Sequence, residues 1–534
     1  MRKLRGDALR IYRAALLAAD PCEAIRRSLR VVASSAADGS HTLSVEGSRR
    51  TYHLEAARAS TTTAAPAPPS RSGCFDRVMI VGGGKASAQM AAELASLLSP
   101  RGIALSGHVV TKRGHADAAT ARSLAAAGVA CSEASHPIPD AAGVEASRAM
   151  LELIARDGSP TTLVIACLSG GGSALLTAPA LGLSLSDVQA STSALLRCGA
   201  PIEEMNTLRK HLSRTKGGQL AQRIEATGAT LLTLVLSDVV GDDLTAIASG
   251  PTVPDRADST FAACVELVER RALTLPDAVL EHLRRGCAGT VAETPKRLGR
   301  GADTDGGDGD GGAVVLCGTN AIAVSAAAVR AEALGYAALV LSTSVVGEAR
   351  EVAKVVAAIA KELVRHGRPL DPRTRPVCVI LGGETTVTLP DGHGLGGRNQ
   401  ELALAAALEI DGLGGVAEEG VVDGESAAYE VVILAAGTDG TDGPCDAAGA
   451  IVDARTAAQG RDAALDGNAY LRTSDSYHFF ERLDAAVHGG GAEEEEEDRV
   501  HLKTGPTGTN VMDITIVLVA PVKGEEGISS PLTT

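Results

Sequence analysis

Short apolar runs that end in glycine-rich turns and lead into helical stretches recur along this chain of 534 residues. RVMIVGGG at residues 77–84 precedes an Ala- and Leu-rich stretch, and the same order recurs from residues 162, 314 and 377. Continuous apolar strands that alternate with helices are typical of parallel sheets covered on both faces. We therefore expect an α/β protein with mostly parallel sheets, in which ligands bind beyond the carboxyl ends of the strands.

Segments of biased composition divide the chain into two predicted domains, in keeping with its length. Residues 299–313 are rich in Gly and Asp, and they predict a linker or loop between an N-terminal domain, residues 1–298, and a C-terminal domain, residues 314–525. Biased composition also predicts one disordered insertion in the first domain and two polar loop insertions in the second, at residues 58–73, 411–429 and 486–499.

Charge and composition argue against nucleic acid and membranes as partners. The chain has 50 Lys and Arg against 65 Asp and Glu, a net charge of −15 that repels both kinds of polyanion. No apolar run reaches the roughly 18 residues that a membrane helix needs. The ten cysteines form no CxxC pair and no zinc-ligand spacing, which favours a reducing compartment. We therefore expect the protein in the cytoplasm. Basic residues near the N-terminus leave a mitochondrial transit peptide as the alternative to an amphipathic first helix.

Two cations stand beside predicted helix starts. Lys85 lies in VGGGKAS and Arg398 in GGRNQE, and each follows a glycine turn and precedes a helical stretch. A helix N-terminus carries about half a positive charge, so a cation is unfavourable there unless an anion bridges the two. Two such units favour a polyanionic ligand over the alternative that both are ordinary surface charges.

Several glycine-rich or polar turns are candidates for phosphate or nucleotide binding. The segment SGGGS follows a buried strand; its backbone could hold phosphates, or it could be a tight turn in which Ser caps a helix. The segments GTN and TGPTGTN are polar turns of the same kind. The residues predicted to bind nucleotide or phosphate are Gly170, Gly171, Gly172, Ser173, Asn320, Thr507, Gly508 and Asn510.

Two acidic strand ends and one basic segment are further candidates. Asp238 and Asp439 each follow an apolar strand, where they could hold Mg²⁺ with substrate phosphates or simply form Asp turns. The segment NTLRKHLSRTKGG brings Arg209, Lys210, Arg214 and Lys216 together in an acidic chain. This segment predicts either an anion-binding patch or a solvated helix face.

Taken together, these motifs resemble the glycerate kinases whose C-terminal part is called the MOFRL domain. The matching stretches, in the order of that family, are VGGGKAS, HPIPD, LSGGGSALL, NTLRKHLSRTKGG, LSDVVGDDLTAIASGPTVPD, GGETTVTL, GGRNQELALA, AAGTDGTDGP and GPTGTNVMDI. The resemblance implies an N-terminal Rossmann-like domain with helices on both faces of its sheet and a smaller C-terminal α/β domain with a mixed sheet. It also implies an active site in the cleft between the two domains.

The resemblance implies ATP- and Mg²⁺-dependent phosphorylation of D-glycerate to 2-phosphoglycerate, with 3-phosphoglycerate as the other product to consider. The catalytic cations of that family match Lys85 and Arg398, the pair that the charge argument selects. We expect Arg209 and Lys210 to bind the substrate, and Asp238 or Asp439 to hold the metal. D-Glycerate and ATP are the expected partners, and a homo-oligomer stays open.

Two other functions compete with the kinase. An NAD(P)-dependent hydroxypyruvate reductase would suit a Rossmann-like fold, but the strand GHVVTKRG ends without the acidic residue that binds a ribose. A non-catalytic nucleotide-binding protein would keep the glycine turns, but the presence of both Lys85 and Arg398 argues for activity.

Overall fold

The computed structural model describes residues 1–35, 40–46, 50–56, 74–299, 313–413, 428–488 and 498–522. The chain divides into two compact units, Asp20–Thr319 and a second unit that joins Met1–Ala19 to Asn320–Thr534. The predicted insertion at 58–73 lies outside the described residues, as do most of the predicted segments 299–313, 411–429 and 486–499.

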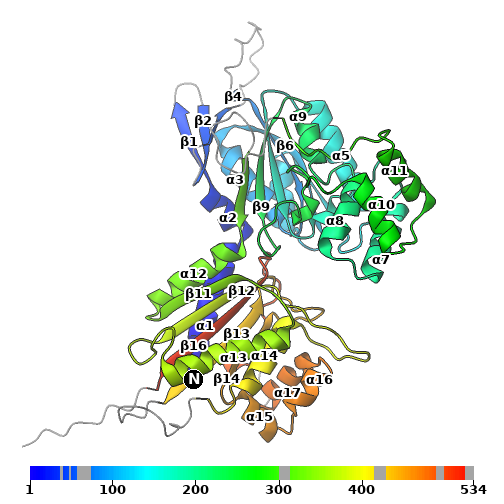
Figure 1. Cartoon of the computed structure of the whole chain (residues 1–534). Helices are drawn as coiled ribbons and strands as arrows, with labels where there is room; N and C mark the ends of the chain where they lie inside the picture. Colours follow the sequence, from blue (N-terminus) through cyan, green and yellow to red (C-terminus); the bar gives the residue numbers. More distant parts are fainter. Residues whose placement is uncertain are drawn as a thin grey trace, which may run out of the picture. The chain divides into compact units, whose positions relative to one another are not determined.

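A parallel sheet of six strands forms the centre of the unit Asp20–Thr319 (Figure 1). Its strand order is β10-β9-β8-β5-β6-β7, and every neighbouring pair is parallel. The bounds are β5 (Arg77–Gly83), β6 (Ala104–Lys112), β7 (Val129–Ala134), β8 (Thr162–Ser169), β9 (Thr230–Leu236) and β10 (Ala313–Gly318). The parallel sheet predicted for the N-terminal part is confirmed.

Helices cover both faces of this sheet, which explains why every residue of the central strand β8 is buried. Helices α5 (Ala141–Asp157) and α9 (Gln219–Glu225) pack on the face that carries Met79, Val81 and Val164. Helices α3 (Ser87–Leu98) and α4 (Ala118–Ala126) pack on the other face. The remaining elements at the start of this unit are α2 (Pro21–Ser28), η1 (Ser99–Arg101) and a small sheet of β1 (Leu29–Ser35), β2 (Ser40–Val45), β3 (Thr51–Glu55) and β4 (Cys74–Phe75).

Four helices of the same unit form a separate apolar cluster in which Leu208, Cys264 and Val279 are fully buried. They are α7 (Leu185–Arg197), α8 (Ile202–His211), α10 (Phe261–Arg270) and α11 (Asp277–Cys287). Helix α7 begins with a capping box between Ser184 and Asp187, which satisfies backbone donors at its first turn. Two short elements, α6 (Gly172–Leu175) and η2 (Ile247–Ser249), follow the ends of β8 and β9.

The second unit contains a mixed sheet in the order β11-β12-β16-β13-β14-β15, and the predicted mixed sheet is confirmed. Strand β11 is parallel to β12, and the other neighbouring pairs are antiparallel. The bounds are β11 (Ala337–Val345), β12 (Val377–Gly383), β13 (Tyr429–Gly437), β14 (Gly449–Asp453), β15 (His501–Leu502) and β16 (Asp513–Pro521).

Helices cover both faces of the mixed sheet as well. Helices α13 (Ala349–His366) and α14 (Arg398–Glu409) pack together on one face, while α1 (Arg2–Ala19) and α12 (Asn320–Ala333) pack together on the other (Figure 1). Three shorter helices, α15 (Thr456–Asp462), α16 (Gly467–Arg472) and α17 (Ser476–His488), complete the unit. Among the described helices, none combines the length and apolar character that crossing a bilayer requires.

The compact units differ from the predicted domains at two places. Strand β10, placed by the sequence at the start of the second domain, pairs with β9 and completes the parallel sheet of the first unit. Helix α1, placed in the first domain, belongs to the second unit, where the hydroxyl of Tyr12 donates a hydrogen bond of 2.6 Å to the carbonyl of Gly437. The amphipathic helix predicted at the N-terminus is confirmed.

We expect Ile11→Ala to lower the free energy of unfolding of the second unit by about 2–5 kcal/mol, because it leaves a cavity where α1 packs on the rest of that unit. Ile11 is fully buried, whereas Leu17 on the same helix is 63% exposed. Leu17→Ala is therefore the matched control and should change stability by less than about 0.5 kcal/mol. Urea denaturation followed by circular dichroism measures both, and equal losses would contradict the packing of α1.

Candidate active site

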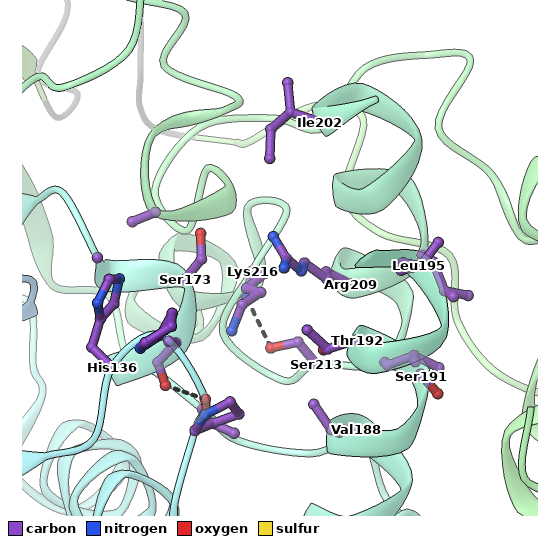
Figure 2. A pocket seen from close by; sticks show the side chains of 18 of the residues that line it. His136, Ser173, Val188, Ser191, Thr192, Leu195, Ile202, Arg209, Ser213 and Lys216 are labelled. Atoms are coloured by element: carbon purple, nitrogen blue, oxygen red, sulfur yellow. Dashed lines mark hydrogen bonds between the residues drawn. The ribbon is translucent and has the colours of Figure 1, made fainter. Parts of the chain in front are cut away.

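A cavity of about 290 Å³ lies at the carboxyl edge of the parallel sheet, beside helices α7 and α8 (Figure 2). The loops after β7, β8 and β9 line one side of it, through His136, Gly171, Ser173 and Asp238. Helices α7 and α8 and the segment after α8 line the other side. This is the edge at which an α/β sheet binds its ligands.

The glycine-rich loops after β5 and β8 hold each other by hydrogen bonds. The N–H of Lys85 donates to the carbonyl of Gly170 at 2.8 Å, and the N–H of Ala86 donates to the hydroxyl of Ser169 at 3.0 Å. A Cβ on Gly84, whose φ is +150°, would overlap the Ser169 side chain. These backbone donors of VGGGKAS are thus occupied within the protein, and the loop can offer an anion mainly the Lys85 side chain.

The Lys85 ammonium has no ion pair and no hydrogen bond to any residue that the structure describes. Its side chain passes Gly171, where a Cβ would lie 3.3 Å from Lys85 Cγ and 3.1 Å from His136 Cδ2. Burial, followed by the charges of Lys85, Lys112 and His115, lowers the pKa of His136 to about 4. His136 is therefore neutral at pH 7, and the charge on this side of the cavity comes from lysine.

Asp238 lies directly against the loop that carries SGGGS. A Cβ on Gly170 would overlap the Asp238 carboxylate, so only glycine permits this approach. The N–H groups of Gly171 and Ser173 have no hydrogen-bond partner in the described part of the chain. A carboxylate and free backbone donors are thus brought to one edge of the cavity.

Two residues that sequence reasoning missed connect this loop to α8. The hydroxyls of Ser173 and Ser249 lie 2.8 Å apart, and the Ser249 hydroxyl donates to Asn206 Oδ1 at 3.0 Å. Ser249 and its neighbour Ala248 have left-handed backbone, with φ of 61° and 51°. Such strain persists where the surroundings enforce it, often at functional sites. Asn206 and Ser249 both stand in the motifs that carry the family resemblance, but no local feature of the sequence predicted that they contact each other.

The cations of the basic segment have different surroundings. Lys210 Nζ contacts Asp255 Oδ1 at 2.7 Å, both side chains are almost fully buried, and Lys210 does not line the cavity. Arg209 and Lys216 do line the cavity. Lys216 donates to the Leu176 carbonyl at 2.8 Å, and Arg209 has no ion pair or hydrogen bond among the described residues.

Burial and then the charge of Arg209 lower the pKa of Lys216 to about 7. Burial also lowers the pKa of Arg209. The structure therefore divides the predicted anion-binding patch into one internal ion pair, at Lys210, and two cations that face the cavity.

Arg398 lies in the second unit and is compensated by carboxylates of that unit. Its Nε and Nη2 donate to Asp513 at 2.6 and 2.9 Å, and its Nη1 lies 3.1 Å from Glu384 Oε1. Burial opposes its charge, but Asp513 and then Glu384 raise the pKa of the guanidinium. The position of Arg398 at a helix start predicts a nearby anion, and Asp513 and Glu384 place carboxylates there.

Asp442 supplies a negative charge to the N-terminus of α14. Its carboxylate accepts hydrogen bonds from the backbone N–H and the side-chain amide of both Asn399 and Gln400, at 2.8 to 3.2 Å. A Cβ on Gly397 would overlap this carboxylate, and burial raises the pKa of Asp442 to about 6. The first turn of α14, which carries Arg398, is therefore fixed by Asp442 from the loop after β13.

The polar turns of the second unit serve its local fold. Asp439 Oδ1 accepts two hydrogen bonds of 3.0 Å from the backbone N–H and the hydroxyl of Thr441. The Thr507 hydroxyl donates to the carbonyl of Thr438 at 2.5 Å. Asn510 Oδ1 accepts a backbone N–H at 3.0 Å, while Gly508 has left-handed backbone with φ of +81°. Asn320 is buried, and its amide donates to two carbonyls at the start of β16, at 2.9 and 3.0 Å.

The predicted site residues thus fall into two groups. The unit Asp20–Thr319 brings Lys85, Arg209, Asp238 and the loop Gly170–Ser173 to the cavity or its edge, and the remaining candidates other than Lys210 lie in the second unit. Across the described residues, no group of three or more His, Cys, Asp or Glu side chains is placed to hold a metal ion. Lys216, from the predicted basic segment, also lines the cavity, as does His136, for which the sequence indicated no specific role.

Comparison with known proteins agrees with the fold. Residues 7–284 match the domain of unknown function DUF4147, and residues 377–513 match the MOFRL family. Glycerate 2-kinase of Pyrococcus horikoshii is 36% identical over 450 residues, which cover 84% of this chain and 88% of that protein. A protein of Agrobacterium vitis named as a hydroxypyruvate reductase is 39% identical over 448 residues, covering 83% and 99%.

The crystal structure of glycerate kinase from Thermotoga maritima has a TM-score of 0.73 to this chain at 33% identity, and covers 97% of this chain and 100% of that one. Fold and site together define an α/β protein with an electropositive cavity at the carboxyl edge of a parallel sheet. The chain belongs to the glycerate kinase family, with a DUF4147 domain followed by a MOFRL domain.

We expect the stability of the protein to depend on the titration of Lys216. Its pKa falls from an ordinary 10.5 to about 7 on folding, so the unfolded chain binds more protons there between these pH values. Raising the pH through this window should increase the free energy of unfolding. Lys216→Met removes this titration. The Tm of the wild type minus the Tm of the variant should therefore increase from pH 7 to pH 10.

Differential scanning fluorimetry at several pH values measures this difference. Lys354→Met, at an exposed position on α13, is the control and should give a difference that stays flat with pH. A flat difference for Lys216→Met as well would contradict the lowered pKa.

Proposed function

We propose that this protein is an ATP-dependent kinase that phosphorylates D-glycerate to 2-phosphoglycerate. The observation that carries the proposal is the Lys85 ammonium, which has no partner among the described residues and passes the loop of SGGGS beside Asp238. The family to which the chain belongs, and the glycerate kinases among its relatives, support the choice of substrate.

Phosphoryl transfer needs positioning and neutralisation of charge more than covalent chemistry by the protein. The free N–H groups of Gly171 and Ser173 are suited to phosphate oxygens, because backbone donors hold an anion without the entropy cost of ordering a side chain. Lys85 adds a full positive charge next to this loop and would stabilise the negative charge that develops on the transferred group.

The surroundings of Asp238 fit a magnesium ion that arrives with ATP. Mg²⁺ commonly takes one or two carboxylates together with phosphate oxygens, and Asp238 stands beside the loop proposed to hold those phosphates. When bound, the metal supplies charge neutralisation across the phosphates. Asp238 would hold it, and the tight contact with Gly170 fixes the position of the carboxylate. A metal role for Asp439 stays a prediction.

In the second unit, Arg398 is proposed as the second catalytic cation. Its fork is preorganised by Asp513, and Asp442 fixes the helix start that carries it. Guanidinium groups bind planar anions with two parallel hydrogen bonds, which suits either a phosphoryl group or a carboxylate. Nucleotide contacts by Asn320, Thr507, Gly508 and Asn510 stay predictions.

A coupled assay tests the proposal. Purified protein with D-glycerate, ATP and Mg²⁺ should release ADP only when glycerate is present, and EDTA should abolish turnover. Phosphorus NMR of the product should show 2-phosphoglycerate rather than 3-phosphoglycerate. Oxidation of NADH with hydroxypyruvate in the absence of ATP would instead identify a reductase and overturn the proposal. Nucleotide binding without any turnover would favour a non-catalytic protein.

We expect Lys85→Met and Arg398→Met each to lower kcat by about 10²-fold or more, the scale for removing one charge-stabilising donor. Arg122→Met, an exposed change of the same charge on α4, should leave kcat unchanged. Steady-state kinetics measures all three. A near-normal kcat in either test variant would contradict a catalytic role for that residue.

The two variants should differ in stability, which separates catalytic from structural effects. Lys85→Met removes a cation without a described partner and should keep or raise Tm. Arg398→Met leaves Asp513 without its guanidinium in a site where that carboxylate is only 9% exposed, so Tm should fall. In the double variant, a loss of kcat smaller than the product of the single losses would show that both cations act on one group.

A further inference from the structure

The α7–α8 cavity contains two cations that the proposed chemistry at Lys85 does not use. Arg209 and Lys216 line this cavity, and Asp238 is the acidic residue among its described lining residues. Figure 2 shows both side chains in the middle of the cavity, with His136 and Ser173 on one side and the α7 residues Ser191 and Leu195 on the other. Neither cation forms an ion pair with a described residue.

The neighbouring residue Lys210 shows that the lack of an ion pair is not a general property of the basic segment. Lys210 has a buried carboxylate partner, Asp255, at 2.7 Å, whereas Arg209 and Lys216 have no such partner in the part of the chain that the structure describes. Removing cations from water without a counter-ion is costly. Lys216 is only 5% exposed, and its ammonium donates a hydrogen bond of 2.8 Å to the carbonyl of Leu176. Burial leaves Lys216 only partly protonated at pH 7, and an anion bound beside it and Arg209 would favour its charged form.

The geometry of the cavity indicates which anion. A volume of about 290 Å³ is at the small end for ligand pockets and suits a short organic acid. The planar fork of Arg209 matches a carboxylate, which it can bind with two parallel hydrogen bonds. The hydroxyls of Ser173, Thr192 and Ser213 also line the cavity, and they can hydrogen-bond the hydroxyl groups of such an acid.

We propose that Arg209 and Lys216 bind the carboxylate of the acceptor hydroxy acid in the α7–α8 cavity. The acid is then directed with its hydroxyl end toward the opposite wall, where Gly171, Ser173 and Asp238 lie. This inference rests on the proposed kinase function for the identity of the acid, and it adds a carboxylate site to the sequence-predicted role of Arg209. Lys210, which the sequence grouped with Arg209, takes no part because Asp255 holds it.

Isothermal titration calorimetry and steady-state kinetics test the proposal with two probes, D-glycerate and the uncharged analogue glycerol. Arg209→Met and Lys216→Met should each raise the Kd and the KM for D-glycerate at least tenfold, with the KM for ATP unchanged. Arg197→Met, an exposed change of the same charge at the end of α7, is the matched control and should behave as wild type. Glycerol should not bind, because it lacks the carboxylate.

The outcomes separate this inference from the proposed function. If wild type binds D-glycerate and both Met variants lose it, but ATP is not turned over, the carboxylate site stands and the kinase proposal fails. If the variants raise the KM for ATP and leave that for D-glycerate unchanged, the cavity holds nucleotide and the inference is overturned. It is overturned too if both variants bind D-glycerate as Arg197→Met does.

A conservative variant keeps the test decisive should a Met variant not fold. Arg209→Lys retains the charge and loses the planar fork, so the Kd for D-glycerate should rise severalfold while Tm stays near that of wild type. An unchanged Kd in a folded Arg209→Lys protein would overturn the paired hydrogen bonds from Arg209.

Discussion

The candidate site depends on close contact between backbone segments at the carboxyl edge of the parallel sheet. A Cβ on Gly84 would overlap the Ser169 side chain, and one on Gly170 would overlap the Asp238 carboxylate. Because these positions lack side chains, the loops after β5, β8 and β9 can meet. That meeting places the Lys85 side chain, a carboxylate and the N–H groups of Gly171 and Ser173, which lack a partner among the described residues, within one region. A single added methyl group at either glycine would push these loops apart.

The basic residues of this protein differ in whether the protein itself compensates their charge. Lys210 and Arg398 are paired with carboxylates, and their charges are compensated before any ligand arrives. Lys85 and Arg209 have no such partner among the described residues. Since an uncompensated cation in a partly buried place is costly, Lys85 and Arg209 are the cations for which we propose ligands. For Arg398, catalysis would have to use a guanidinium that Asp513 already orients.

Much of the fold and part of the site could be predicted because they depend on local patterns. Apolar runs that end in glycine turns predict parallel strands, and the carboxyl ends of parallel strands meet at one edge. This is why Lys85, Gly171 and Asp238 were predicted and also lie near one another. His136 could not be predicted as a cavity residue, because its loop reaches the cavity only after β7 takes its place at the end of the sheet.

The sequence by itself determined the α/β class and the motifs that carry the family resemblance, and it predicted the carboxyl edge as the place for ligands, since all of these follow from short-range order. Only the tertiary structure decided that α1 packs with the second unit and that β10 completes the first sheet. It also decided which basic residue is paired, because Asp255 lies 45 positions from Lys210 along the chain. Long-range contacts select such partners, and local propensity carries no information about them.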